Sequence, residues 1–185
     1  MTESSNLIPA SHLILGGANS GKSLFAENLC MRSGLNCIYV ATSRILDTEM
    51  KTRVSRHISQ RGNGWTTKEE PVELVDILQQ TCRPNAIVLV DCLTMWLNNL
   101  VFDGVELPER IEQLCTIIPT LQGSVVFVSN ELGMGLVPDT ALGRTFRSHQ
   151  GQTNQAIARV VTNVTFVAAG LPLQLKSNSN KDAQQ

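Results

Sequence analysis

Residues 16–23 of this 185-residue chain read Gly16-Gly17-Ala18-Asn19-Ser20-Gly21-Lys22-Ser23 and match the pattern G-x-x-x-x-G-K-[ST]. In such loops, glycines let backbone N–H groups approach phosphate oxygens, and the N-terminus of the following helix favours anions. The apolar run His12–Gly16 precedes the loop, and Ser23–Arg32 has helical spacing. We therefore predict that Lys22 contacts the β- and γ-phosphates and that the Ser23 hydroxyl ligates Mg²⁺. A glycine-rich turn with an exposed lysine is the simpler alternative.

Short apolar runs rich in β-branched residues recur along the chain and alternate with longer mixed stretches. After His12–Gly16 we expect strands at Asn36–Thr42, Ala86–Asp91, Ser124–Ser129 and Asn163–Ala169, and an edge strand at Leu171–Leu175. Helices are expected over Ser23–Arg32, Val72–Gln80, Pro108–Leu121 and Gln155–Val161. Strands that are apolar on both faces are typical of parallel sheets with crossover helices. The sequence thus predicts a three-layer α/β fold with a mainly parallel central sheet.

The composition excludes several classes of protein. Hydrophobic residues make up 42% of the chain and charged residues 17%, which suits a folded core. Fifteen Lys and Arg against sixteen Asp and Glu give a net charge of −1, so we expect no binding to nucleic acid through bulk charge. No apolar run approaches the ~20 residues that a membrane span needs. The five cysteines form no C-x-x-C pair, which is typical of reduced thiols in the cytoplasm.

We expect a single nucleotide-binding catalytic domain at residues 12–176. Residues 1–11 are interpreted as a flexible leader. They have neither the basic start nor the apolar stretch of a secretory signal, so we expect no such signal. The polar residues 177–185 are interpreted as a disordered tail. Together with the cysteine pattern, this organisation predicts a cytoplasmic protein.

An acidic residue follows the third apolar run, where Ile87-Val88-Leu89-Val90 ends in Asp91. The end of such a strand lies at the carboxyl edge of the sheet, where open α/β sheets bind ligands. We predict that Asp91 holds the magnesium ion or its water shell, together with Ser23. The alternative is an aspartate that caps the next element.

Polar residues also follow the second and fourth apolar runs. Thr42-Ser43-Arg44 can bind phosphate or a base, or can simply start a helix. Ser129–Gly135 contains two glycines separated by one residue, which is typical of a loop shaped for close approach or of a plain strand-to-helix turn. Arg144 and Arg147 are three residues apart and can share a helix face, either on phosphate or in solvent. By composition alone, His57 is more simply a solvated residue near a helix end.

The order and spacing of several blocks resemble one enzyme family. The blocks are GGANSGKS, YVATSRILDTEM, RH followed by W and TKEEP, LVDCLTMWLNN, VSNELGMGLVP with GRTFR, and AAGLPLQLK. They are similar to the bifunctional adenosylcobinamide kinase / adenosylcobinamide-phosphate guanylyltransferase family of cobalamin biosynthesis. The resemblance extends from about Leu13 to Lys176, and D-C-L-T-x-W-L-x-N and S-N-E-x-G-x-G are its most specific blocks.

The resemblance implies a RecA-like P-loop fold, a homotrimer and two reactions. The first phosphorylates the hydroxyl of the aminopropanol arm of adenosylcobinamide with ATP or GTP. The second transfers GMP from GTP to that phosphate through a guanylylated histidine, whose matching position is His57. The implied catalytic residues are His57 and Lys22. The implied nucleotide contacts are Gly16, Gly17, Ala18, Asn19, Ser20, Gly21, Lys22, Ser23, Thr42, Ser43, Arg44, Ile58, Ser59, Gln60, Arg61, Glu69 and Asp91.

The chemistry agrees with the residue types. A neutral imidazole, with a pKa near ~6.5, is a competent nucleophile at neutral pH. Covalent catalysis through it divides one difficult substitution into two easier ones. Two alternatives remain open at this point: a monofunctional small-molecule P-loop kinase, in which His57 is structural, and a nucleotide-binding module without catalytic activity.

Overall fold

The computed structural model describes residues 10–44 and 64–177. These residues form a seven-stranded sheet in the order β3-β2-β4-β5-β1-β6-β7. Its strands are β1 (Ser11–Gly16), β2 (Asn36–Ala41), β3 (Trp65–Glu69), β4 (Ala86–Asp91), β5 (Ser124–Asn130), β6 (Asn163–Ala168) and β7 (Leu171–Lys176). Every neighbouring pair is parallel except β6 and β7, which form an antiparallel pair at one edge.

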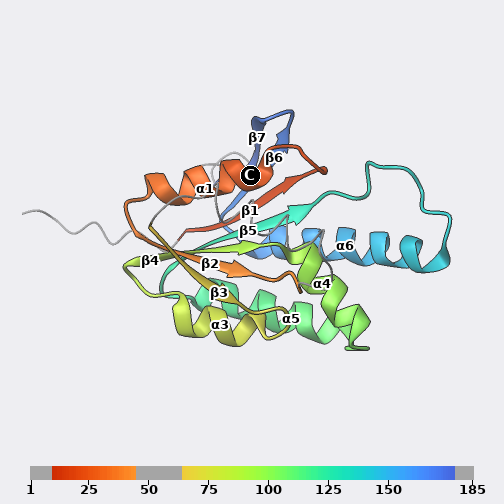
Figure 1. Cartoon of the computed structure of the whole chain (residues 1–185), viewed down its shortest axis with the longest axis horizontal. Coiled ribbons are helices and arrows are strands. Elements are labelled where there is room, and N and C mark those ends of the chain that lie inside the picture. The colour runs from red at the N-terminus through yellow and green to blue at the C-terminus, as the bar shows by residue number, and fades with distance from the viewer. Residues whose placement is uncertain (1–9, 45–63, 178–185) are drawn as a thin grey trace, which may run out of the picture.

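Helices cover both faces of the sheet, as Figure 1 shows. They are α1 (Lys22–Arg32), α3 (Leu74–Thr81), α4 (Leu93–Phe102), α5 (Leu107–Ile117) and α6 (Ala141–Val160), with a 3₁₀ turn at Ile118–Thr120. Helix α1 packs on one face against β1, β4, β5 and β6, and α3, α5 and α6 lie together on the other. The described part of the chain is therefore a three-layer α/β structure, and the predicted fold class is confirmed.

Two apolar clusters fill the space between these layers, because neighbouring residues of a strand face opposite sides of the sheet. Leu13 and Leu15 of β1 join the larger cluster beneath α3 to α6, while Ile14 joins the smaller one beneath α1. Trp96 is buried in the larger cluster. Strand β5 divides likewise, so that Phe127 and Val128 face opposite layers. This alternation sets which side chains at the end of each strand face the phosphate loop.

The predicted strands are confirmed, and the four predicted helices are found with shifted bounds. Three features differ from the sequence prediction. Strand β3 was not predicted, because WTTKE is polar and largely exposed at the sheet edge. Helix α4 was not predicted, because it is buried on most sides and shows little helical alternation. Helix α6 begins at Ala141 and not near Gln155, although Gly143 and Gly151 lie within it.

The boundaries of the expected domain, leader and tail stay predictions. Strand β1 begins at Ser11, whose backbone N–H donates to Thr162 Oγ1 at 3.0 Å. Most of residues 1–11 and 177–185 lie outside the described residues. No helix in residues 10–44 and 64–177 is long and apolar enough to cross a membrane.

Candidate functional site

The phosphate loop connects the end of β1 to the start of α1. Gly21 precedes α1 with φ at 92°, a left-handed conformation that favours glycine. A Cβ atom at Gly21 would lie 3.1 Å from Gly170 Cα, and one at Gly16 would lie 2.5 Å from the carbonyl oxygen of Val167. The glycines at positions 16 and 21 are therefore required by close packing against the end of β6 and against the β6–β7 turn. The predicted strand–loop–helix context is confirmed.

Hydrogen bonds within the loop and to Gly170 stabilise the conformation of the loop backbone. Lys22 Nζ donates to the carbonyl of Gly17 at 3.0 Å, and the Ser20 backbone N–H donates to the same oxygen at 3.2 Å. The backbone N–H of Gly170 donates to the Ser20 carbonyl at 2.8 Å. The buried hydroxyl of Ser20 finds no hydrogen-bond partner among the residues that the structure describes. A buried polar atom of this kind is suited to a ligand.

Asp91 lies at the carboxyl end of β4, two strands away from β1. In the sheet, Asp91 pairs in register with Ala41 of β2 on one side and with Val128 of β5 on the other. Burial, and after it the negative charge of Asp91, raise the pKa of the neighbouring Cys92 thiol to about 11, against the opposing positive charge of Lys22. Lys22 begins α1 after the loop that follows β1, and Asp91 ends β4, so both residues lie at the carboxyl edge of the parallel sheet.

The residues after β2 make contacts within the protein. Thr42 Oγ1 donates to the carbonyl of Cys92 at 2.7 Å and accepts from its backbone N–H at 2.8 Å. Arg44 forms a bidentate pair with Asp103, at 2.7 and 2.5 Å, and this guanidinium lowers the pKa of the Asp103 carboxyl. Ser43 is half-buried, and Glu69 is exposed at the end of β3. Thr42 therefore holds the β4–α4 junction, whatever else it contacts.

Three side chains of the D-C-L-T-x-W-L-x-N block hold the surrounding backbone. Asn99 Nδ2 donates to the carbonyls of Thr42 and Pro71, at 2.7 and 3.0 Å. Trp96 Nε1 donates to the carbonyl of Val72 at 2.9 Å. Thr94 Oγ1 accepts from the backbone N–H of Asn130 at 3.0 Å. Sequence reasoning gave these side chains no role, although the specificity of the block indicated that they matter.

A second polar cluster lies buried between β5 and α6. Gln150 Nε2 donates to Ser129 Oγ at 2.8 Å and to Asn154 Oδ1 at 3.1 Å, and Ser129 Oγ donates to Asn154 Oδ1 at 2.7 Å. Asn154 Nδ2 donates to the carbonyl of Asn130 at 3.1 Å. Both backbone groups of Asn130 are thus held by side chains, one from α4 and one from α6. Asn130 pairs in register with Gly16, so this cluster fixes β5 beside the phosphate loop.

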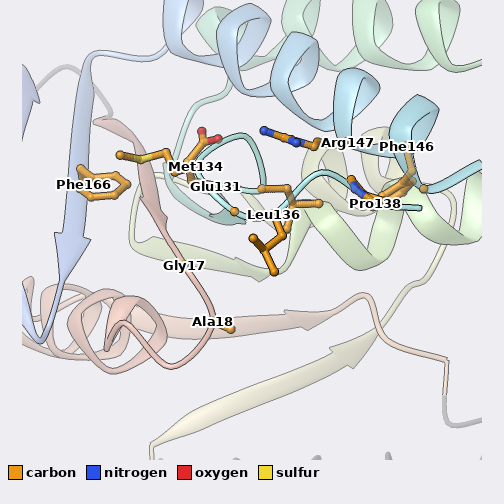
Figure 2. A pocket seen from close by; sticks show the side chains of 12 residues that line it. Gly17, Ala18, Glu131, Met134, Leu136, Pro138, Phe146, Arg147 and Phe166 are labelled. Carbon is orange, nitrogen blue, oxygen red and sulfur yellow. The ribbon is translucent and has the colours of Figure 1, made fainter. Parts of the chain in front are cut away.

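A cavity of about 570 Å³ opens next to the phosphate loop, between the loop after β5 and the start of α6 (Figure 2). Gly17 and Ala18 form one side of it. Most of the other lining side chains are apolar, and the two charged ones are Glu131 and Arg147. Arg147 donates to the carbonyl of Gly133, and Glu131 Oε1 accepts from the backbone N–H of Gly133 at 2.6 Å. The sequence indicated this loop and Arg147, but not that they enclose a cavity.

Several predicted site residues lie outside the described residues, namely His57 and Ile58–Arg61. Residues 10–44 and 64–177 contain no group of three or more His, Cys, Asp or Glu side chains that could hold a metal ion. Among the predicted site residues that the structure describes, it brings together the loop at residues 16–23, Asp91, and the ends of β2 and β3 along one sheet edge.

Comparison with known proteins identifies the family. A family model described as cobinamide kinase / cobinamide phosphate guanyltransferase matches residues 12–175. This chain belongs to that family. It is 43% identical over 166 residues to the bifunctional adenosylcobalamin biosynthesis protein CobP of Pseudomonas aeruginosa, an alignment that covers 89% of this chain and 96% of that protein. It is also 36% identical over 179 residues to the bifunctional protein CobU of Escherichia coli, covering 89% and 98% of the two chains.

Solved structures of lower sequence similarity show the same fold. The flagellar accessory protein FlaH from Methanocaldococcus jannaschii has a TM-score of 0.51 at 14% identity, covering 93% of this chain and 81% of its own. A protein from Pyrococcus horikoshii has a TM-score of 0.56 at 13% identity, covering 94% and 88%. These likenesses support the three-layer α/β fold and carry no further information about activity.

Membership of the family establishes the activity. The protein is a transferase with cobinamide kinase and cobinamide-phosphate guanylyltransferase functions in cobalamin biosynthesis. The resemblance based on the sequence blocks is confirmed, and a nucleotide-binding module without catalytic activity is excluded. The substrates are small molecules, including nucleotides.

Proposed function

We propose that both reactions use one triphosphate site, formed by Gly16–Ser23 with Asp91. The observation that supports this most directly is the loop itself, whose conformation leaves backbone N–H groups and the Lys22 ammonium group beside a helix N-terminus. Its glycines at positions 16 and 21 pack closely against Val167 and Gly170, which supports a defined loop conformation. A chain of this size with one phosphate loop has a simple way to serve two reactions: the same triphosphate site used twice.

The nucleoside part of the substrate belongs, in this proposal, at the ends of β2 and β3. Glu69, Ala41 and Asp91 occupy one register row across β3, β2 and β4. Ser43 and Arg44 follow that row directly, and Thr42 fixes its backbone. We assign Thr42, Ser43, Arg44, Ile58–Arg61 and Glu69 to this half of the site, on the matching positions of the family.

Mg²⁺ fits the residues at the centre of the site. Ser23 offers a hydroxyl in the first turn of α1, and Asp91 offers a half-buried carboxylate at the end of β4. Hydroxyl and carboxylate oxygens are the ligands that Mg²⁺ uses when most of its shell comes from phosphate and water. When bound, the ion neutralises charge on the phosphates, while Lys22 and the loop N–H groups position them.

The kinase reaction needs positioning more than covalent chemistry. The hydroxyl oxygen of adenosylcobinamide forms a bond to the γ-phosphorus, the bond from that phosphorus to the bridging oxygen breaks, and the hydroxyl proton is released. The nucleoside diphosphate leaves. Lys22 and the loop N–H groups stabilise the charge that develops on the phosphate oxygens. ATP or GTP can serve as the donor.

The guanylyl transfer uses His57 in two steps. An imidazole nitrogen attacks the α-phosphorus of GTP, a P–N bond forms, and pyrophosphate leaves. A phosphate oxygen of adenosylcobinamide phosphate then attacks the same phosphorus, the P–N bond breaks, and adenosylcobinamide-GDP forms. The histidine is released for another cycle.

The histidine step is tested by incubating the protein with GTP labelled at the α-phosphorus. We expect acid-labile label on the wild-type protein and none on the variant His57→Ala. His149→Ala is the matched control, because His149 lies on α6 and the proposal gives it no role. If His57→Ala retains the label, another residue is the nucleophile. If the wild type forms product without ever acquiring label, transfer is direct.

We further propose a cytoplasmic homotrimer that requires no nucleic acid. The exposed side chains Leu171, Leu173 and Leu175 lie on β7, the strand at one edge of the sheet, and an apolar row of this kind suits a contact between subunits. Sedimentation of the wild type gives the mass directly. If the protein is a monomer at all concentrations, the trimer is contradicted. If either enzymatic activity requires added nucleic acid, the proposal that no nucleic acid is needed is contradicted.

A further inference from the structure

We propose that the cavity between the phosphate loop and the start of α6 is the acceptor site, which binds adenosylcobinamide and then its phosphate. This assignment rests on the cobinamide kinase and guanylyltransferase activities of the family. Beyond those activities, the proposal specifies where the second substrate of each reaction binds. The residues that decide it are Gly17 and Ala18 on one side and Glu131, Met134 and Leu136 on the other.

The position of the cavity supports this role. Phosphoryl transfer requires the acceptor oxygen in line with the bond that breaks, directly beside the bound phosphates. Gly17 and Ala18 belong at once to the phosphate loop and to the wall of the cavity. The backbone N–H of Glu131 donates to the carbonyl of Gly16 at 3.0 Å, so the opposite wall is attached to the first residue of the loop.

The sheet order separates this cavity from the proposed nucleoside site. The nucleoside residues follow β2 and β3, whereas the cavity is formed by residues that follow β1 and β5, with Phe166 of β6. In the order β3-β2-β4-β5-β1-β6-β7, Asp91 of β4 lies between the two groups. The nucleoside and the acceptor can therefore bind simultaneously, one on each side of the terminal phosphates.

The lining matches the chemistry of the acceptor. A corrinoid presents apolar edges of a large ring together with polar side arms. The cavity offers Leu132, Met134, Leu136, Pro138, Phe146 and Phe166 as apolar surface. Met134 is 79% exposed and Leu136 96% exposed, so both lose contact with water when a large ligand covers them. A volume of about 570 Å³ is less than a whole corrinoid occupies, so the aminopropanol arm and one ring edge enter.

Two charged side chains suit the two acceptors. Figure 2 shows the guanidinium of Arg147 extending toward the carboxylate of Glu131 along the cavity wall. In the kinase reaction, the Glu131 carboxylate accepts a hydrogen bond from the hydroxyl of the arm and orients it. In the guanylyl transfer, Arg147 faces the phosphate that the first reaction has added. The cavity thus holds an acidic group for a hydroxyl and a basic group for a phosphate.

The apolar wall is tested with the double variant Met134→Ser, Leu136→Ser. We expect the KM for adenosylcobinamide to rise about tenfold or more, because two side chains no longer cover the ligand. The kcat at saturating adenosylcobinamide and the KM for the nucleotide should stay at the wild-type values. Leu142→Ser is the matched control, because Leu142 is 68% exposed at the start of α6, close along the chain, and does not line the cavity.

The role of Glu131 is tested with Glu131→Gln, which keeps an oxygen for the Gly133 N–H and removes the charge. We expect the kcat of the kinase reaction to fall about tenfold or more. Guanylyl transfer to adenosylcobinamide phosphate supplied directly should change less than twofold. An equal fall in both reactions contradicts the orienting role.

Three outcomes overturn the cavity assignment. An unchanged KM for adenosylcobinamide in the double variant shows that the acceptor binds elsewhere. A raised nucleotide KM alone assigns the cavity to the nucleoside, and dissociation into smaller species with both KM values unchanged assigns it to a contact between subunits. Wild-type turnover is measured first, so that failure of the kinase activity itself is distinguished from failure of the cavity assignment.

Discussion

Two sequence blocks of this protein follow neighbouring strands, yet they differ in almost every physical respect. Asp91–Asn99 begins with the last residue of β4, and Ser129–Gly135 begins with the last two residues of β5, its partner in the sheet. In the first block Asn99 is 2% exposed and donates to two backbone carbonyls. In the second block the chain rises to the surface, and Met134 is 79% exposed.

The difference is one of function as well as of burial. Buried polar side chains without partners are costly, so the contacts of Asn99, Thr94 and Trp96 restrict the backbone to one arrangement. The exposed apolar residues of the second block stabilise nothing in the described fold, and their hydration is unfavourable until a ligand covers them. A specific sequence block can therefore serve as a scaffold or as a binding surface, and only the structure distinguishes them.

The largest expected effect comes from the phosphate loop, which follows β1, the neighbour of β5 in the sheet. Lys22→Ala removes the ammonium group that we place on the phosphates, and we expect kcat/KM to fall by ~10²–10³ in both reactions. Initial rates with adenosylcobinamide and with adenosylcobinamide phosphate measure the two effects separately. The melting temperature serves as the control for folding.

A loss confined to one of the two reactions would contradict the shared site. The two reactions would then need separate phosphate sites, and the comparison between a scaffold block and an acceptor block around one loop would fail.

Asn99→Ala tests the scaffold block. The change leaves the carbonyls of Thr42 and Pro71 without their donor, and we expect a loss of about 2–3 kcal/mol in the free energy of unfolding. Denaturation in urea measures it. Asn98→Ala is the matched control, because Asn98 is exposed on the same helix and should change stability by less than about 0.5 kcal/mol. Equal changes in the free energy of unfolding for the Asn98 and Asn99 variants would show that the buried hydrogen bonds of Asn99 do not stabilise the fold.

Most of the fold could be predicted, because it depends on patterns that one segment contains by itself. The strands at Ser11–Gly16 and Ala86–Asp91 are continuous apolar runs, and the phosphate loop has a fixed spacing. Strand β3 was not predicted because it lies at the edge of the sheet, where its polar residues stay exposed and the sequence shows no apolar run. Helix α4 escaped prediction for the opposite reason, since burial on most of its sides removes the polar face that identifies a helix.

The site was predictable only where a residue type implies its chemistry. Lys22, Ser23 and Asp91 follow from phosphate and magnesium chemistry, and the structure brings Lys22 and Asp91 to the same sheet edge. The partners of Asn99 and Asn154 could not be predicted, because each donates to backbone carbonyls 24 or more residues away. The cavity depends on side chains from four segments, so no single stretch of sequence indicates it.

The partly buried His12 makes a polar contact outside both blocks, and we expect its titration to give an effect of intermediate size. Its Nε2 lies 2.8 Å from Thr165 Oγ1 on β6, and burial lowers its pKa to about 4. The unfolded chain, with a pKa near ~6.5, therefore binds a proton in the window between about pH 4 and 6.5, where the folded protein does not. Stability is lost as the pH falls through that window, by about 2 kcal/mol at pH 5 from this group.

Urea denaturation of the wild type and of His12→Gln at pH 7 and pH 5 isolates this contribution. The amide of glutamine can reach Thr165 and does not titrate, so the difference between the two pH values should shrink by about 2 kcal/mol in the variant. An identical pH dependence in both proteins would show that the folded His12 titrates like a solvated histidine.

The smallest expected effect sharpens the comparison most, because it concerns stability in the exposed block. Met134→Ser and Leu136→Ser should each change the free energy of unfolding by less than about 0.5 kcal/mol, since neither side chain is buried in the described fold. Denaturation of the two single variants beside Asn99→Ala gives the contrast directly. Denaturation thus gives a threshold: a loss of more than about 1 kcal/mol at either position would mean that apolar contacts within the loop stabilise it.

The block after β5 would in that case be a second scaffold, and a higher KM for adenosylcobinamide in the double variant would follow from a distorted loop. If the stability is unchanged while the KM rises, the apolar side chains act on the ligand, and the two blocks divide the work between holding the sheet edge and holding the acceptor.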